Sequence, residues 1–417
     1  MNYASSFRCV ACGSVEDIQT MHYKCGTCGG YLEVAYSFPK DMNQQIRNRY
    51  HQYKDASILS AWQPVLPLDA TEQIERISLG ERVTPLLAVD RLGTQIGSGR
   101  LFLKCEYYLP TLSLKDRSMA LVVYKAIDYG YDTVSIVSSG NAGASLAAYA
   151  ARAGLKSILL VPADANPAKF SKIRFAGAIL VRIDSHLAQI STLYDQICDE
   201  CGWYNCNGTV NPFRCEAKKT CAYEIVAQLG WKAPDVVLVP TSTGNGLVAY
   251  GIGFQEMQHF GLIEKMPRLV AVQLRACAPI YKAFCSGAEQ IVPVIPEKSI
   301  SDTLLNGNPE AGQKVIDWVR RTHGSVVAVT DEEIVDALEN LGTTEGVFCE
   351  PAGVVTIPAA RRLIMDGFIG KDETVVCLAT GYGLNQPVAV NSLNPSEPVL
   401  QANVENIMNY IRSRESD

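Results

Sequence analysis

Residues 113–117 read Ser-Leu-Lys-Asp-Arg and open a mainly apolar run, Met119–Ile127, that is typical of a helix. A lysine just inside the start of a helix is ordinary, and alone it indicates a solvated side chain. Two glycine-rich stretches further along the chain favour a functional role for Lys115 over a solvated side chain.

Each of these glycine-rich stretches follows a strand-like run and opens a helix. Residues 138–143 read Ser-Ser-Gly-Asn-Ala-Gly and follow Thr133–Val137, whereas residues 241–246 read Thr-Ser-Thr-Gly-Asn-Gly and follow Val236–Val239. Helix N-termini and bare backbone amides bind anions, and a lysine amine forms an imine with an aldehyde. Lys115 and the two turns therefore predict a site for an aldehyde cofactor that carries a phosphate.

The composition is that of an ordinary globular enzyme. The 417 residues predict about two to three domains, and 47% of them are hydrophobic while 19% are charged. A net charge of −6 without a dominant basic stripe argues against a nucleic-acid or anionic-membrane partner. No apolar run is long enough to span a membrane, and the N-terminus lacks a charged-then-apolar signal, so we expect a cytoplasmic protein.

Four of the 14 cysteines form two C-x-x-C pairs near the N-terminus, Cys9 with Cys12 and Cys25 with Cys28, each followed by a glycine. Paired thiolates at this spacing chelate zinc in a tetrahedral site. We therefore predict a structural zinc site; the alternative is a ribbon that has kept its cysteines without the metal. Four cysteines leave no open coordination position, so catalytic zinc is not expected.

The other cysteines are expected to be ordinary thiols. Cys198 and Cys201 form another C-x-x-C pair, with Cys206 close by, but no second pair accompanies it. Several more lie in or beside apolar stretches and are predicted to be small core residues: Cys105, Cys277, Cys285, Cys349 and Cys377.

Beyond residue 78, short apolar runs alternate with helical ones such as Pro167–Ala176. Strands are predicted at Arg100–Cys105, Thr133–Val137, Ser157–Val161, Ala178–Ile183, Val236–Val239, Arg268–Val272, Val326–Val329 and Thr374–Leu378. Apolar strands separated by helices predict a parallel α/β sheet covered on both faces. Ligands bind such sheets outside the carboxyl ends of the strands, where the turns at Ser139, Thr243 and Thr380 lie. The polar and aromatic residues of segment 37–77 predict an arm of exposed linker character that packs over the main body.

Six stretches match one known family in order. They are Ser78–Glu81 with Thr84–Leu86, Pro110–Arg117, Ser138–Ser145, Val210–Arg214, the turn at Gly244, and Thr380–Leu384. Together they resemble the threonine synthase branch of fold-type II pyridoxal-phosphate enzymes, from about Ser78 to Asn385. The N-terminal ribbon also occurs in that branch.

The resemblance implies a two-domain α/β fold with parallel or mixed sheets covered by helices. It divides the chain into a zinc-ribbon-like segment (1–36), an arm (37–77), a large cofactor-binding domain (78–117 and 209–417) and a small domain (118–208). A homodimer is expected from the family alone.

The resemblance also assigns cofactor contacts by position. Lys115 would carry pyridoxal 5'-phosphate and move protons as the general acid and base. Asn141 would hydrogen-bond the phenolic oxygen of the cofactor, and Thr380 would face its pyridine nitrogen. The cofactor phosphate would be held by the backbone of Ser242, Thr243, Gly244, Asn245 and Gly246.

The substrate's own anions need other partners. Ser138 and Ser139 would meet the carboxylate or phosphate of the amino acid. Arg214 is the best candidate for a phosphate leaving group, because a guanidinium binds phosphate in a bidentate way. The alternative for Arg214 is an ion pair with Glu216 or Glu224. Three nearby charged residues are predicted to be structural: Glu106, Asp116 and Arg117.

The leading functional hypothesis is loss of phosphate from O-phosphohomoserine and addition of water to give threonine. A second is β-replacement or β-elimination on O-phosphoserine or another substituted amino acid. It stays open because this chain departs from the family beside the lysine, at Leu109, Leu112, Leu114 and Ser118. The non-enzyme alternative is a zinc-binding or nucleotide-binding regulatory module, disfavoured because no G-x-G-x-x-G opens a helix after a strand.

Overall fold

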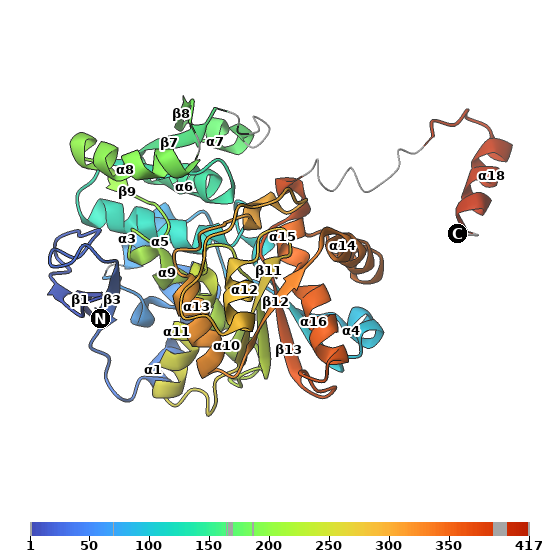
Figure 1. The fold of residues 1–417 in the computed structure, drawn as a ribbon, viewed down its shortest axis with the longest axis horizontal. Coiled ribbons are helices and arrows are strands. Elements are labelled where there is room, and N and C mark those ends of the chain that lie inside the picture. Colours follow the sequence, from blue (N-terminus) through green and yellow to red (C-terminus); the bar gives the residue numbers. More distant parts are fainter. Residues whose placement is uncertain are drawn as a thin grey trace.

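The computed structural model describes residues 2–69, 71–163, 165, 170–185, 187–386 and 398–415. Its strands form a six-stranded, a four-stranded and a three-stranded sheet. Figure 1 shows helices packed around the two larger sheets, with the three-stranded sheet beside them near the N-terminus. The predicted α/β class with parallel and mixed sheets is confirmed.

The six-stranded sheet has the strand order β12-β11-β10-β13-β5-β4. The strands are β4 (Leu86–Ala88), β5 (Arg100–Cys105), β10 (Val236–Pro240), β11 (Arg268–Leu274), β12 (Ser325–Val329) and β13 (Thr374–Ala379). All neighbours pair in parallel except the edge strand β4, which is antiparallel to β5. Parallel pairing brings the carboxyl ends of β5, β10 and β13 to one edge of the sheet.

Both faces of this sheet are buried. In β10, Val237 and Val239 belong to one apolar cluster and Val236 and Leu238 to another, because successive side chains of a strand point to opposite faces. The first cluster includes residues of α10 (Thr220–Gln228), α11 (Asn245–His259), α12 (Pro279–Ser286) and α13 (Gly312–Arg321). The second includes residues of α4 (Asp90–Ile96), α14 (Asp331–Glu345), α15 (Pro351–Val354) and α16 (Thr356–Met365).

The four-stranded sheet is parallel, with the order β8-β7-β6-β9. Its strands are β6 (Thr133–Val137), β7 (Lys156–Pro162), β8 (Ile179–Ile183) and β9 (Tyr204–Asn205), and its chain segment carries α5 (Lys115–Asp128), α6 (Asn141–Ala153), α7 (Ser171–Phe175) and α8 (Leu187–Cys201). The predicted helix Pro167–Ala176 lies partly outside the described residues, and α7 is its described part. The predicted domain limits at residues 118 and 208 stay a proposal.

The N-terminal sheet, order β2-β1-β3, is antiparallel and is followed by the helical arm. The elements are β1 (Ala4–Cys9), β2 (Val15–Glu16), β3 (Leu32–Tyr36), α1 (Asn43–Tyr53), α2 (Ile58–Ala61), η1 (Gln63–Val65) and α3 (Thr71–Ile77). The arm packs on the main body, and residues 37–56 are mostly exposed or half-buried as predicted, but residues 57–68 are buried, so the predicted exposure is wrong there. Trp62 is 1% exposed and its ring lies 5.3 Å from that of Tyr223 in α10, a contact between residues that are far apart in the chain.

The remaining elements are short, apart from the C-terminal helix. They are η2 (Glu106–Tyr108), α9 (Phe213–Glu216), η4 (Ala217–Lys219), η5 (Asp302–Leu304), η6 (Gly383–Asn385) and α18 (Val404–Glu415). Among the helices that the structure describes, none is both long and apolar enough to cross a membrane.

The cysteines outside the N-terminal pairs are free thiols, as expected. Four of the five predicted core cysteines are buried: Cys105, Cys277, Cys349 and Cys377. Cys285 is exposed, so its prediction is wrong. It lies on the solvent side of the amphipathic helix α12, a side that a short apolar stretch does not reveal.

Candidate active site

Backbone hydrogen bonds fix the lysine segment to the end of β13. The amide of Leu114 donates to the carbonyl of Thr380 at 2.9 Å, and the amide of Tyr382 donates to the carbonyl of Leu112 at 3.1 Å. Lys115 is the first residue of α5, so its side chain starts from a fixed point at the carboxyl edge of the sheet. The structure therefore brings Lys115 and Thr380 into one region.

Leu112 has a backbone φ of 66°, in the left-handed region. A residue with a Cβ atom is strained there by about 1–2 kcal/mol. The Leu112 carbonyl accepts hydrogen bonds from the amide of Tyr382 and, at 2.8 Å, from Asn385 Nδ2, and these contacts hold the turn in place. A glycine would adopt this conformation without strain, whereas Leu112 adopts it at a cost.

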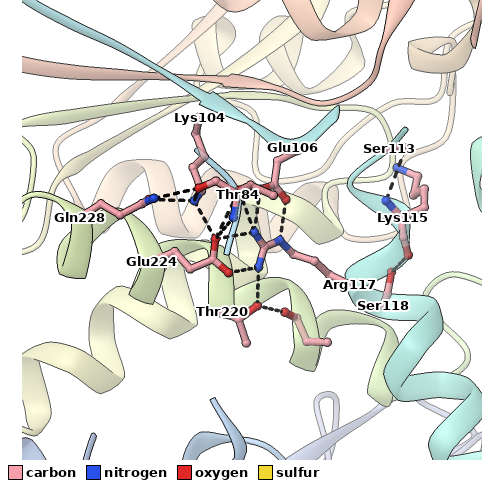
Figure 2. Close-up of polar contacts among 11 residues, drawn as sticks. Thr84, Lys104, Glu106, Ser113, Lys115, Arg117, Ser118, Thr220, Glu224 and Gln228 are labelled. Atoms are coloured by element: carbon pink, nitrogen blue, oxygen red, sulfur yellow. Dashed lines mark hydrogen bonds and ion pairs between the residues drawn. The ribbon is translucent and has the colours of Figure 1, made fainter. Parts of the chain in front are cut away.

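A buried network of charges joins α5, through Arg117, to neighbouring elements (Figure 2). The Arg117 guanidinium donates two hydrogen bonds to Glu106 and two to Glu224, all of 2.6–2.7 Å. Lys104 Nζ donates to Glu224 at 2.7 Å and to Gln228 Oε1 at 2.9 Å. Burial raises the pKa of Glu224, but the charges of Arg117 and Lys104 lower it to about 2. The predicted structural role of Arg117 and Glu106 is confirmed.

Asp116 ties the start of α5 to its neighbours. Its carboxylate accepts from the amide and hydroxyl of Thr111, at 2.7 and 2.6 Å, and from Ser145 Oγ in α6 at 2.5 Å. The side chain is fully buried and uses these three donors. Asp116 is therefore structural, as predicted, and fixes the position of the lysine that precedes it.

The Lys115 amine is held in an environment that disfavours its charge. Burial, and then the positive charge of Arg214, lower the pKa of Lys115 from 10.5 to about 8, whereas Glu350 acts in the opposite direction. A neutral amine is the form that attacks an aldehyde and accepts a proton. The neutral, reactive form of Lys115 is therefore more populated near neutral pH than that of an ordinary lysine.

Glu350 belongs to this region although the sequence reasoning missed it. The carboxylate is 2% exposed, accepts from Asn141 Nδ2 at 3.1 Å, and lies 3.4 Å from Thr380 Oγ1. A Cβ atom at Gly381 would lie 2.2 Å from its Oε1, so Gly381 makes room for the carboxylate. Burial raises the pKa of Glu350, while Asn141 and Lys115 act against that shift.

The signal that could have identified Glu350 is the stretch Glu-Pro-Ala-Gly at residues 350–353. A proline at the first position of a helix marks its start, and α15 begins at Pro351. The sequence analysis did not single out the residue before that start. Thr380, predicted to face the pyridine nitrogen of the cofactor, thus has a buried carboxylate beside it.

The turn between β10 and α11 is shaped for an anion. Gly244 has a φ of 94°, and a Cβ atom there would lie 2.7 Å from Val315 Cγ2. It is the N-cap of the 15-residue helix α11 and supplies no capping side chain. Backbone amides of Ser242 to Gly246 can therefore turn toward a phosphate, and the helix dipole favours the negative charge.

Ser138 and Ser139 lie where β6 gives way to α6, and both are half-buried. Gly140 is the N-cap of α6. A Cβ atom at Gly143 would lie 2.4 Å from the carbonyl oxygen of Ser138, so only glycine lets the turn close over the helix. The two serine hydroxyls therefore stand beside the N-terminus of a 13-residue helix.

Arg214 is buried without a carboxylate. It is 5% exposed, its Nε has no partner, and Nη1 points at the thioether of Met119 at 2.9 Å. The alternative ion pairs are not observed among the described residues: Glu224 is paired with Arg117 and Lys104, and Glu216 with Lys219. An arginine desolvated in this way is prepared for an external anion.

The four N-terminal cysteines converge as the spacing predicted. Cys9 Sγ lies 3.4 Å from Cys28 Sγ, Cys12 Sγ lies 3.6 Å from Cys25 Sγ, and all four sulfur atoms lie within 4.8 Å of one another. Four thiolates around one zinc ion at about 2.3 Å are separated by similar distances. This group is the one candidate metal cluster in the described part of the chain.

The fold and these residues define a class of protein. A buried lysine with a lowered pKa, a glycine turn at a helix N-terminus and an unpaired arginine fit an aldehyde cofactor with a phosphate group. Residues 77–381 match the family described as pyridoxal-phosphate dependent enzyme. The chain is therefore a pyridoxal-phosphate dependent enzyme.

Comparisons with individual proteins show which family of pyridoxal-phosphate dependent enzymes the chain belongs to. The chain is 35% identical over 384 residues to threonine synthase of Methanocaldococcus jannaschii, covering 92% of this chain and 93% of that one. It is 33% identical over 407 residues to threonine synthase of Methanosarcina acetivorans, covering 97% and 98%. The chain belongs to the threonine synthase family of fold-type II pyridoxal-phosphate enzymes, whose members are lyases.

Solved structures agree on the fold. Maize serine racemase superposes with a TM-score of 0.66 at 18% identity, covering 82% of this chain and 97% of the other. The processed form of threonine deaminase isoform 2 from Solanum lycopersicum superposes with a TM-score of 0.63 at 17% identity, covering 87% of this chain and 98% of that one.

Proposed function

We propose that this protein converts O-phosphohomoserine and water into threonine and phosphate. The carbon–oxygen bond at Cγ breaks with loss of phosphate, and the hydroxyl of water becomes bonded to Cβ. The observation that carries the proposal is the state of Arg214. Its guanidinium is buried, its Nε has no hydrogen-bond partner, and its positive charge helps to lower the pKa of Lys115. The relationship to threonine synthases supports it.

Each residue of the site has a separate proposed role in this reaction. Pyridoxal phosphate, when bound, withdraws electrons from the carbon atoms of an attached amino acid. Lys115 accepts and returns protons at these carbons, which its lowered pKa permits. Arg214 binds the departing phosphate and stabilises its charge. Ser138 and Ser139 bind the carboxylate of the substrate.

The remaining contacts hold the cofactor. Asn141 would bond its phenolic oxygen, and Thr380, with Glu350 beside it, would face its pyridine nitrogen. Its phosphate would be held by the backbone of Ser242, Thr243, Gly244, Asn245 and Gly246. The raised pKa of Glu350 means that this carboxyl takes up a proton more readily than an exposed one.

We also propose a structural zinc ion on Cys9, Cys12, Cys25 and Cys28, and a cytoplasmic homodimer. The convergence of the four sulfur atoms supports the first; the family supports the second. Metal analysis should find one zinc per chain, and a Cys9→Ser, Cys25→Ser variant should lose it. Light scattering should give twice the mass of the chain; a monomer at assay concentration would contradict the dimer.

A second candidate is β-replacement or β-elimination on O-phosphoserine. Leu112 favours it, because a leucine stands near Lys115 where the family has glycine. A departure from the family pattern so close to the lysine in the sequence is consistent with a different substrate, such as one that is a methylene shorter. Phosphate release from O-phosphoserine that is faster than from O-phosphohomoserine would establish this reading in place of the first.

The test measures phosphate and threonine together. The purified protein should show the absorbance band of the imine between the cofactor and Lys115, and Lys115→Ala should lose that band. O-phosphohomoserine should yield phosphate and threonine in equal amounts. Arg214→Met should strongly reduce the rate of phosphate release from O-phosphohomoserine but leave the rate of threonine deamination largely unchanged, because threonine has no phosphate. Equal loss of both activities would remove the assigned role of Arg214.

A further inference from the structure

Arg214 and Lys218 lie on one face of a continuous helical segment. Arg214 is in α9 and Lys218 is in η4, which follows it directly. Residues four apart in a helical segment are neighbours on its surface. Both side chains are buried, at 5% and 4% exposure.

Neither cation is neutralised by the protein. Among the described residues, no carboxylate forms an ion pair with Arg214 or Lys218, and Arg214 Nε has no hydrogen-bond partner. The groups that face Lys218 are Arg214, Cys215 and Lys115. Burial, then the charge of Arg214, lower the pKa of Lys218 to about 7, with a further contribution from Lys115, while Cys215 acts in the opposite direction.

The neighbouring lysine is an internal control. Lys219 is 1% exposed, yet its Nζ lies 2.9 Å from Glu216 and 2.8 Å from Glu256. Burial lowers its pKa, but these two carboxylates raise it above the ordinary value overall. Of two adjacent buried lysines, one has two partners and the other has none, so burial in this segment does not by itself leave a lysine unpaired.

The segment that carries the unpaired cations lies beside the cofactor turn. Cys215 Sγ lies 3.7 Å from the carbonyl oxygen of Asn245, at the start of α11. The turn already offers backbone amides and a helix N-terminus to the cofactor phosphate. Two further positive charges on the adjacent segment exceed what that phosphate needs and match the charge of a second dianion.

We propose that Lys218 and Arg214 together form one buried binding site for a phosphate-type dianion that the substrate brings. Lys218 thereby selects substrates whose leaving group is phosphate over those with a neutral or singly charged group. The proposal deepens the proposed function, on which it rests for the molecule that carries the phosphate. It holds equally for a phosphate on homoserine or on serine.

The test titrates orthophosphate into the holoenzyme by calorimetry, with homoserine as a ligand that lacks the phosphate. Lys218→Met should weaken orthophosphate binding about 10- to 100-fold, the worth of one charge-assisted hydrogen bond. Lys218→Arg, which keeps the charge, should stay much closer to the parent protein. Homoserine should bind Lys218→Met as it binds the parent protein. Unchanged orthophosphate affinity in a folded Lys218→Met holoenzyme would overturn the proposal.

A second arm identifies the source of the dianion. Holoenzymes are diluted into phosphate-free buffer, and the cofactor absorbance that remains on the protein is measured. Equal retention in the parent and Lys218→Met proteins supports a substrate phosphate. Faster cofactor loss from Lys218→Met would assign Lys218 to the cofactor phosphate and contradict the proposal. Orthophosphate binding needs no turnover. Failure to form threonine would therefore contradict the proposed function but not the measured effect of Lys218→Met on orthophosphate binding.

Discussion

Two groups of buried charges flank the first turns of α5, and they differ in one respect. Arg117 and Lys104 are fully paired with Glu106 and Glu224. Arg214 and Lys218 are buried to a similar degree but have no carboxylate among the described residues. A paired buried charge fixes the scaffold, because its partners are already in the fold. An unpaired buried charge is costly, and a ligand is what compensates it.

The segment that carries the unpaired pair is itself braced from the other face. Phe213 packs edge-on against Phe7 of the ribbon, with ring centroids 5.6 Å apart. Tyr36 of β3 donates a hydrogen bond to Glu216, and Lys219 Nζ lies 4.1 Å from the centroid of the Tyr36 ring. The ribbon therefore contacts the side of the segment opposite to Arg214 and Lys218 and holds them in place.

The largest expected effect comes from breaking the paired group. Glu224→Leu should lower the free energy of unfolding by about 3–5 kcal/mol, because it leaves Arg117 and Lys104 without their shared carboxylate. Denaturant titration of the ligand-free protein measures this change. A loss below about 1 kcal/mol would mean that the network behaves like a surface ion pair.

The matched change in the unpaired group should have the opposite sign. Lys218→Met should raise the free energy of unfolding of the ligand-free protein by about 1–4 kcal/mol, since it replaces an uncompensated buried charge by an apolar side chain of similar length. Lys219→Met serves as the control and should destabilise, because Glu216 and Glu256 lose their partner. If both lysine variants destabilise alike, Lys218 is paired in solution and the contrast fails.

The pH dependence sharpens the same contrast. The pKa of Lys218 is about 7 in the folded protein and 10.5 when unperturbed, so the unfolded chain binds more protons between these values. Stability therefore rises with pH in that window, and the cost of the charge is full below pH 7. The stability difference between Lys218→Met and the parent protein should shrink as pH rises from 7 to 10.5. A difference that stays constant across the window would contradict the lowered pKa.

The smallest expected effect concerns the strained turn. Leu112→Gly relieves a positive φ but loosens the unfolded chain, so it should stabilise the protein by at most about 1 kcal/mol. Leu112→Ala keeps the strain, loses the side chain and should destabilise. Thermal unfolding of the two variants compares them directly. An alanine variant as stable as the glycine variant would show that the φ value costs nothing.

The sequence predicted those parts of the site that depend on local pattern. Strand β5 follows from a run of apolar residues, and the glycine turns follow from glycines placed between a strand-like run and a helical one, and both kinds of signal are local. Glu350 was missed because its importance depends on contacts with Asn141 and Thr380, which are far away in the chain. The burial of Trp62 was missed for the same reason.

Lys218 shows most clearly what could not be predicted from the sequence. In the sequence it is one of two adjacent lysines, and nothing local distinguishes it from Lys219. Only the fold places carboxylates beside one and none beside the other. The same holds for Arg214, for which the sequence left an ion pair with Glu216 or Glu224 open until the partners of those carboxylates were known.

The most direct test of this contrast is a crystal structure of the holoenzyme grown with orthophosphate. We expect an anion within hydrogen-bond distance of Arg214 Nε and Lys218 Nζ, with the Arg117 network unchanged. The contrary result is the absence of an anion there, with Arg214 or Lys218 turned to a carboxylate of the protein. In that case unpaired burial would no longer distinguish the ligand site from the scaffold.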